Sequence, residues 1–269
     1  MTSRVGAVPV VAVLSVVLGF TVMVSGQATS VSLPRTPDGK PNFNGIWQTL
    51  NTADWDLQAH AAQQGRFDLG ALGAVPPGLS VVDGNAIPYL PAALAKKKAN
   101  FDKRMTDDPA IKCYMPGVPR ATYMPFPFQI VQTPGAILVS YQFASAARVI
   151  EMRPLKEAPV DTWMGQSSGR WEGDTLVVDA TGFNGNAWLD RSGNYASDEL
   201  KVVERYTLMT PDAIMYEAVL EDPAVFSKPW KISMPIYRRL EKNAQLLEFK
   251  CVEFAEELMY GKFTKKPGR

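Results

Sequence analysis

A long series of short alternating segments, beginning at Phe128, limits the fold of this chain more than any other feature. β-Branched and aromatic residues recur at alternate positions, and Pro-Gly, Gly-Asp, Pro-Asp or Asn-Ala pairs separate several segments. This pattern predicts half-buried β-strands joined by tight turns. We expect strands at residues 128–133, 136–143, 147–152, 169–172, 175–180, 200–209, 213–221, 230–240 and 246–252, after an earlier strand at residues 43–50.

Strands that follow one another so closely favour an antiparallel up-and-down barrel, because closure removes the exposed edges of the sheet. A sandwich of two sheets is the alternative. The length suits one domain over residues 44–262. Residues 29–43, with their prolines, are expected to form an extended lead-in, and residues 263–269 a short tail.

Residues 54–110 are expected to form a helical insertion after the first strand. Asp54 can cap a helix that continues through Ala61, and residues 92–104 form an amphipathic helix directly after Pro91. The Gly- and Pro-rich residues 65–88 between them predict a surface loop.

Residues 1–28 have the organisation of a secretory signal peptide. Arg4 precedes a long apolar stretch, and small residues around Gly26 provide a cleavage motif. A retained membrane anchor is the alternative, because residues 5–24 are long enough to span a bilayer. We expect cleavage, and therefore a periplasmic or secreted protein that has no membrane contact after its export.

The charged residues are almost balanced, with 28 Lys and Arg against 27 Asp and Glu. Nucleic acids and anionic membranes call for a clustered basic excess, so neither is an expected partner. The chain has one His and two Cys, and it contains no phosphate-binding Gly-rich loop, no nucleophile elbow and no pair of His residues. We therefore expect no metal and no cofactor.

Cys113 and Cys251 lie too far apart in sequence to form a local metal knuckle. In an oxidising compartment, two lone cysteines are expected to form a disulfide. Two buried free thiols are the alternative.

Two resemblances to known families add to these expectations. Gly45-Ile46-Trp47, on the first predicted strand, resembles the signature of lipocalins and other calycins. In that fold the Trp closes one end of the barrel and an Arg from a late strand packs over it. The resemblance implies that Arg238 or Arg239 is this partner.

The second resemblance extends over nearly the whole chain after the signal peptide. It is carried by NTADWDLQAHAA at residues 51–62, KCYMPGVPRATYMP at 112–125, GRWEGDTLVVD at 169–179, and EDP and PW at 221–223 and 229–230. These segments are similar to a family of exported bacterial proteins to which no activity is assigned. The resemblance implies an exported β-rich domain. Its members often have Glu at the position of Gln142 and a His near Tyr195, which argues against chemistry at those two positions.

Two clusters hold residues suited to acid–base chemistry. Asp56 and His60 are four positions apart, so on the predicted helix the carboxylate would orient the imidazole as a general base. The alternative is a capped helix start with an exposed His. Glu217 and Glu221 share one face of the strand at residues 213–221. If that face lines the barrel interior, burial would raise their pKa values to a useful range; if it faces water, they only solvate the surface.

Other residues suit a ligand site. Trp188, Asp190 and Arg191 lie on a long polar loop before a strong strand. At a barrel mouth, an aromatic ring beside an acid–base pair can line such a site. A surface ion pair with Trp188 as its anchor is the alternative.

The aromatic and Pro-rich residues 114–128 include Tyr123 and Phe126. They would either wall an apolar pocket or plug the end of the barrel. Arg148 could lie inside the barrel as the counter-ion of a carboxylate, with Tyr141 as an orienting group.

These observations leave acid–base catalysis without a cofactor, or binding alone. The leading expectation is an exported lyase, isomerase or hydrolase that acts on a small apolar or aromatic metabolite in a barrel cavity. Its catalytic candidates are Glu221, Glu217, His60, Asp56 and Tyr141. The alternative is a non-catalytic binding protein for a small hydrophobic ligand. A purely structural or interaction role comes third.

Overall fold

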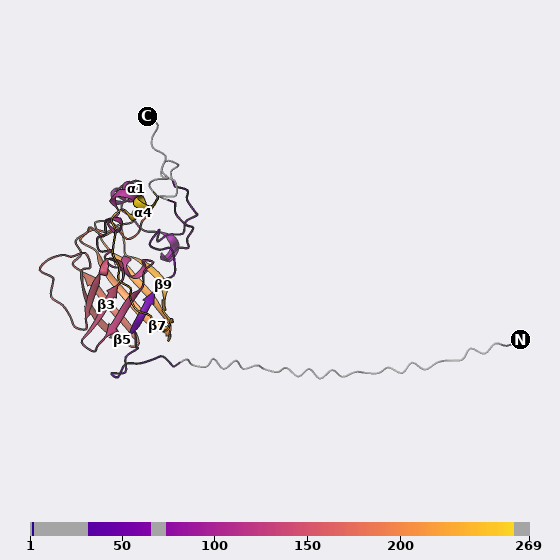
Figure 1. The fold of residues 1–269 in the computed structure, drawn as a ribbon, viewed down its shortest axis with the longest axis vertical. Helices are drawn as coiled ribbons and strands as arrows, with labels where there is room; N and C mark the ends of the chain where they lie inside the picture. The colour runs from indigo at the N-terminus through magenta and orange to yellow at the C-terminus, as the bar shows by residue number, and fades with distance from the viewer. Residues whose placement is uncertain (1, 3–31, 66–73, 261–269) are drawn as a thin grey trace, which may run out of the picture. The chain divides into compact units, whose positions relative to one another are not determined.

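The computed structural model describes residue 2, residues 32–65 and residues 74–260, and its core is a closed barrel of nine strands (Figure 1). The strands are β1 (Gly45–Gln48), β2 (Phe128–Gln132), β3 (Ala136–Tyr141), β4 (Ala147–Glu151), β5 (Gln166–Glu172), β6 (Thr175–Thr181), β7 (Lys201–Thr210), β8 (Ala213–Glu221) and β9 (Trp230–Arg238). Each strand pairs with the next in the chain, and β9 pairs with β1. The prediction of a mainly β barrel is therefore confirmed.

One strand pair departs from the predicted antiparallel arrangement. β4 and β5 run parallel, with Ile150 opposite Ser167 and Glu151 opposite Ser168. The number of strands explains this difference, because directions cannot alternate all the way around a closed ring of nine. One parallel pair is the least that such a ring requires. Residues 152–165 form the crossover that a parallel pair needs.

The tenth predicted strand, at residues 246–252, is absent from the barrel. No strand or helix lies between the end of β9 at Arg238 and the start of helix α4 (Ala255–Tyr260). β1 already pairs with both β2 and β9, so the barrel has no free edge for another strand. The segment contacts one end of the barrel instead.

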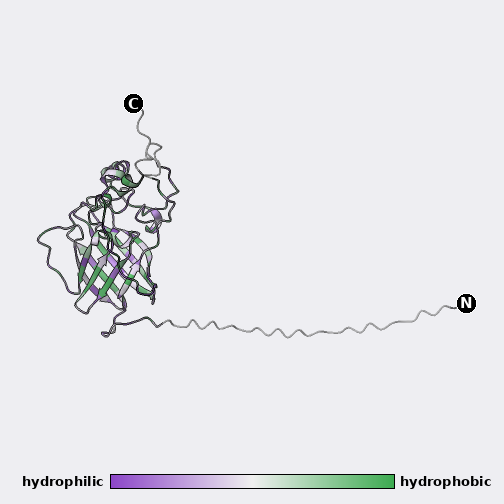
Figure 2. Cartoon of the chain, viewed as in Figure 1, coloured by the Kyte–Doolittle hydropathy of each residue, from purple (hydrophilic) through white to green (hydrophobic). Residues whose placement is uncertain are grey.

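The strands alternate between the barrel interior and its outer surface, as β8 illustrates. Ile214, Tyr216 and Leu220 are buried, whereas Met215 and Glu217 between them are only partly covered. The same alternation gives the strands in Figure 2 their mixture of hydrophobic and hydrophilic colours. Large side chains, most of them apolar, fill the interior, and the void lined by Phe43, Phe128 and Tyr206 measures only about 10 Å³.

Trp47 and Arg238 contact each other where β1 pairs with β9 and closes the barrel. The guanidinium carbon lies 4.2 Å from the centre of the Trp47 ring, and Arg238 Nη1 donates to the carbonyl oxygen of Asn44 at 2.6 Å. Gly45 makes this approach possible, since a Cβ there would lie 2.2 Å from Arg238 Nη1. The Arg over the Trp is thus present, and of the two predicted partners it is Arg238.

Short helices and loops gather beyond one end of the barrel, where Figure 1 shows α1 (Pro91–Asp102) and α4. Also described are α2 (Arg104–Asp107), α3 (Arg120–Tyr123) and the 3₁₀ turns η1 (Asp83–Asn85), η2 (Pro109–Lys112) and η3 (Phe143–Ser145). All four residues of α3 are buried, and the Thr122 carbonyl accepts a hydrogen bond from Thr49, directly after β1. α3 therefore plugs this end of the barrel.

The predicted helix at residues 92–104 is confirmed as α1 and the start of α2. The predicted helix from Asp54 through Ala61 is wrong, because this stretch forms turns and bends. Its backbone groups bond to distant partners instead: Leu57 N–H donates to Asp190, and the Asp54 carbonyl accepts from Arg191 N–H. These tertiary hydrogen bonds replace the ladder of a helix.

No helix within the described residues is long and apolar enough to cross a membrane. Apart from residue 2, the predicted signal peptide at residues 1–28 lies outside the described residues, and so does the tail at residues 263–269.

Candidate functional site

A cavity of about 410 Å³ lies between the plugged end of the barrel and the segment that follows β9. Its walls are mainly apolar. Three phenylalanine rings meet there: the centre of the Phe249 ring lies 5.1 Å from that of Phe126 and 5.2 Å from that of Phe143. Met105 and Met124 add flexible apolar surface to the same walls.

Charged side chains border the same cavity. Arg120 is buried, and all three of its nitrogens are bound: Nη1 and Nη2 donate to Asp108 at 2.8 and 2.9 Å, and Nε donates to Asp54 at 2.8 Å. Burial opposes the charge on Arg120, but the two carboxylates outweigh it and raise the pKa of the guanidinium well above its usual value. The carboxylates of the cavity are thus held by a fixed cation.

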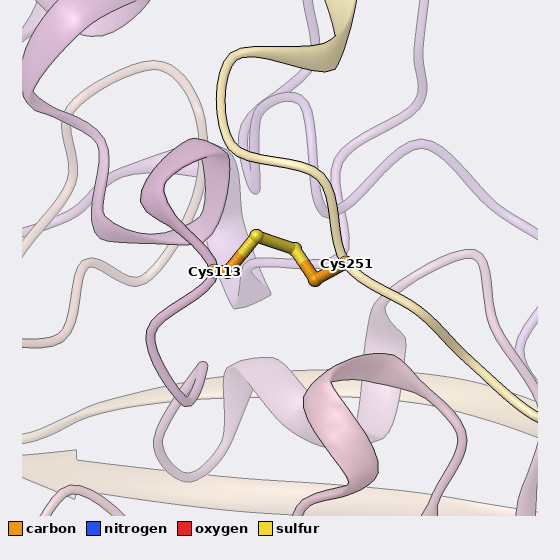
Figure 3. Close-up of a disulfide and its surroundings, with 2 residues drawn as sticks. All are labelled: Cys113 and Cys251. Atoms are coloured by element: carbon orange, nitrogen blue, oxygen red, sulfur yellow. A yellow bond between two sulfur atoms is a disulfide. The ribbon is translucent and has the colours of Figure 1, made fainter.

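The segment after β9 forms one wall of the cavity and is covalently attached to the opposite side. Cys251 on this segment forms a disulfide with Cys113, which follows η2, as Figure 3 shows. The Cα atoms are 5.7 Å apart. The predicted disulfide is therefore confirmed, and it joins two segments that both line the cavity.

The barrel interior contains a second polar cluster, separate from the cavity lining. Arg148 Nη2 donates to Glu204 at 2.7 Å, and the hydroxyls of Tyr206 and Tyr216 donate to the other Glu204 oxygen, each at 2.9 Å. Desolvation, and then the Glu204 carboxylate, raise the pKa values of both tyrosines well above the usual range. Arg148 is thus the counter-ion of a carboxylate, as predicted.

Tyr141 also lies inside the barrel, near Arg148. Its hydroxyl makes no hydrogen bond with the described residues, and neither do Nε and Nη1 of Arg148. Burial raises the pKa of Tyr141, although the nearby Arg148 charge opposes this shift. These groups are enclosed in a filled interior, so the structure does not place Tyr141 in the cavity.

Asp190 organises the loop before β7, at the plugged end of the barrel. It accepts hydrogen bonds from the backbone N–H groups of Leu57, Ser192 and Asn194 and from the side chains of Ser192 and Asn194. Desolvation, and then the negative charge of Asp56, raise its pKa to about 6. The alternative of a surface ion pair between Asp190 and Arg191 is wrong, because Asp190 is completely buried.

The other residues predicted for a ligand site divide between the cavity and the protein core. Phe126 and Arg191 line the cavity, and the Arg191 guanidinium also lies over the ring of Trp55 at 4.1 Å. Tyr123 is buried and donates to the Leu189 carbonyl at 2.6 Å. Trp188 is nine-tenths buried and lines a different void of about 10 Å³.

Glu217 and Glu221 do not enter the barrel interior. They lie on the outward face of β8, where Glu217 accepts a hydrogen bond from Lys231 at 3.0 Å and Glu221 is exposed. The buried face of β8 carries the tyrosine and aliphatic side chains instead. Of the two readings of this strand, the structure shows the one in which the carboxylates face water.

Asp56 and His60 are not joined in the predicted pair. His60 Nδ1 lies 2.8 Å from the Gln58 carbonyl oxygen, and Asp56 accepts from the backbone N–H of Gln58. The expected pairing required the helix that is absent here. His60 instead borders an open groove of about 640 Å³ formed with residues 77–81 and 233–235.

The cavity residues that reasoning from the sequence missed include Arg120, Asp108, Phe143 and Phe249. Arg120 belongs to the segment at residues 112–125 that carries the family resemblance, and Asp108 precedes a Pro as helix caps often do. No pattern in the sequence links Phe249 to Phe126, because the two residues meet only through the tertiary fold.

The sequence matches no protein-family model, and no curated protein matches it. Among the described residues, no group of three or more His, Cys, Asp or Glu side chains could hold a metal ion.

Proposed function

We propose that this chain is an exported protein that binds a small, largely apolar or aromatic molecule at the plugged end of its barrel. The observation that carries the proposal is the cavity of about 410 Å³ lined by Phe126, Phe143 and Phe249. Its volume falls within the usual range for small-molecule sites, and its mixture of apolar walls with a few polar groups is typical of them.

Binding is favoured over acid–base catalysis by the state of the carboxylates. Asp54 and Asp108 both border the cavity, but both are held by Arg120 at 2.8 Å. Both carboxylates are the counter-ions of a buried guanidinium, which gives them a structural role in the wall of the cavity. Glu217 and Glu221 lie elsewhere, on the outer surface of β8.

The shape of the walls favours a flat, aromatic ligand. The Phe126 and Phe249 rings meet edge to face at an interplanar angle of 72°, so they offer both a ring face and a ring edge. Arg120 is neutralised by its carboxylates, and we therefore expect apolar contact to supply most of the affinity.

Two further observations support the wider proposal. The Trp47–Arg238 contact supports a calycin-like relationship. Because side chains fill the barrel interior, the proposed ligand site lies at the plugged end of the barrel and not inside it. The disulfide is consistent with an oxidising environment, and so with export to the periplasm or to the medium.

The test is a fluorescence titration of the full chain with N-phenyl-1-naphthylamine, a neutral aromatic probe. Ala110 lines the cavity, so Ala110→Phe should fill it and weaken binding by about tenfold or more. Ala147→Phe, at an exposed position on β4, is the matched control and should leave the affinity unchanged. Equal affinities for both variants, or no binding to the unmodified chain, would reject the cavity as the site.

Asp190, whose pKa is raised to about 6 by desolvation and by the charge of Asp56, does not make the cavity catalytic, because its side chain is completely buried and is not part of the cavity lining. Catalysis at the cavity predicts conversion of a bound ligand to a product, and mass spectrometry of the recovered ligand distinguishes it from simple binding.

A further inference from the structure

The segment after β9, which forms one wall of the cavity, differs from the other walls because it has no regular secondary structure. It has no strand and no helix between Arg238 and Ala255, whereas the opposite side is built on the barrel, α3 and η2. Five consecutive or nearly consecutive residues of this segment line the cavity: Phe249, Lys250, Cys251, Val252 and Phe254. A segment without regular structure therefore supplies a large part of the candidate site.

Few noncovalent contacts hold this wall in place. The Phe254 backbone N–H donates to the Ile111 carbonyl at 2.9 Å, and the Leu247 N–H donates to the Gln142 side chain at 3.3 Å. Phe249 adds its two ring contacts. Leu247 and Val252 are 64% and 51% exposed, so neither side chain is anchored in the core. Segments with so few buried contacts open at low free-energy cost.

The disulfide is the one covalent attachment of this wall within the described residues, and both of its cysteines are partly exposed. Cys113 follows η2, whose Ile111 accepts the wall's backbone hydrogen bond. An attacking thiolate can reach a partly exposed disulfide, whereas one enclosed in a core is protected. The covalent attachment therefore lies at the point where the wall closes the cavity, within reach of solvent.

We propose that the Cys113–Cys251 disulfide is a redox-sensitive latch on this cavity, which an external dithiol opens to release the ligand. This inference rests on the proposed binding function. One thiolate of the dithiol attacks a cysteine sulfur and the Cys113–Cys251 bond breaks; the second thiolate then resolves the mixed disulfide. Both cysteines end as thiols, and the dithiol ends as a disulfide, so two electrons and two protons pass to the protein.

The barrel does not depend on this latch for its closure. β1 and β9 pair directly, and the Trp47–Arg238 contact secures the same seam. Reduction should therefore release the wall while the strands stay paired.

The experiment compares the oxidised chain with the chain reduced by dithiothreitol, using N-phenyl-1-naphthylamine as the probe. We expect reduction to weaken probe binding by about tenfold. Amide hydrogen exchange is measured in parallel: Phe254 should lose protection on reduction, whereas Val202 in β7 should keep it. Cys113→Ser/Cys251→Ser is the control, and should bind like the reduced chain with or without dithiothreitol.

Each outcome has a distinct meaning. Phe249→Ala keeps the disulfide but removes the wall's ring, so weak binding by this oxidised variant would support the wall as part of the site. Equal binding by the oxidised and reduced chains would overturn the latch and leave the binding function intact. Loss of protection at Val202 would show that the disulfide maintains the whole fold, which also overturns the latch. If the oxidised chain binds no probe, the proposed function fails and the latch fails with it.

Discussion

Arg148 and Glu204 form an ion pair inside the barrel, with 2.7 Å between Nη2 and Oε2 and almost no solvent exposure of either side chain. The pair joins β4 to β7 across the interior, and Tyr206 and Tyr216 complete the hydrogen bonds of the carboxylate. A buried ion pair contributes little relative to an apolar pair of similar size, but the loss of one partner is costly.

Glu204→Gln should therefore destabilise the protein strongly. It leaves the Arg148 charge buried without a counter-ion, which costs about 3–5 kcal/mol. Glu217→Gln removes a carboxylate from a partly exposed pair with Lys231 and should cost less than about 1 kcal/mol. Urea unfolding monitored by circular dichroism measures both changes. Similar losses for the two variants would mean that the interior pair is hydrated or is not formed.

The stability of the protein should fall as the pH rises from about 4 to about 6, through the titration of Asp190. The pKa of this group is near 3.8 in the unfolded chain and about 6 in the folded protein. Because the folded pKa is the higher one, the group stabilises the fold below the unfolded value, and this contribution is lost as the pH rises through 6. The whole effect amounts to about 3 kcal/mol at most.

Asp56→Asn isolates this effect, because the Asp56 charge is the second cause of the raised pKa and an amide can still accept from Gln58 N–H. Urea unfolding of both proteins at pH 4.5 and pH 6.5 should show a smaller fall for the variant. Identical slopes would show that Asp56 does not act on Asp190.

Gly45 is expected to tolerate no side chain. Its φ angle is 137°, and an added Cβ would lie 2.2 Å from Nη1 of Arg238, so Gly45→Ala must displace the guanidinium from Trp47. We expect a loss of about 2–4 kcal/mol from the combined strain and lost contact. Gly39→Ala is the matched control, because Gly39 also has a positive φ angle but no atom lies within 4 Å of its added Cβ. Thermal unfolding compares the two, and an equal shift in Tm would remove the steric argument.

The fold could be predicted from the sequence to the extent that it depends on local pattern. Alternation located β8 at its observed bounds, Ala213–Glu221, because one face of that strand is buried along its whole length. The alternation at residues 246–252 is just as clear, yet the barrel closes without them. Closure is decided by strand count and by pairing between β1 and β9, which a local pattern does not contain.

The candidate site was harder to predict because its residues meet through tertiary contacts. Phe126 and Arg191 were identified from their neighbours in sequence, but Phe249 reaches the cavity only through a segment that failed to become a strand. The alternation of β8 left the orientation of Glu217 open, since period two defines two faces without saying which one is inside. Asp56 and His60 depended on a helix that tertiary hydrogen bonds replaced.

The central claim is that the cavity walled by the three phenylalanines is the ligand site, and the methyl groups of the methionines test it most directly. Met105 and Met124 line this cavity, Met234 borders the groove near His60, and Met215 lies on the outward face of β8. The measurement is a carbon–proton NMR titration of the oxidised, methyl-labelled protein with N-phenyl-1-naphthylamine. We predict saturable shifts at Met105 and Met124 and none at Met215 or Met234. Shifts confined to Met234, or no shift at Met105 and Met124, would contradict the account.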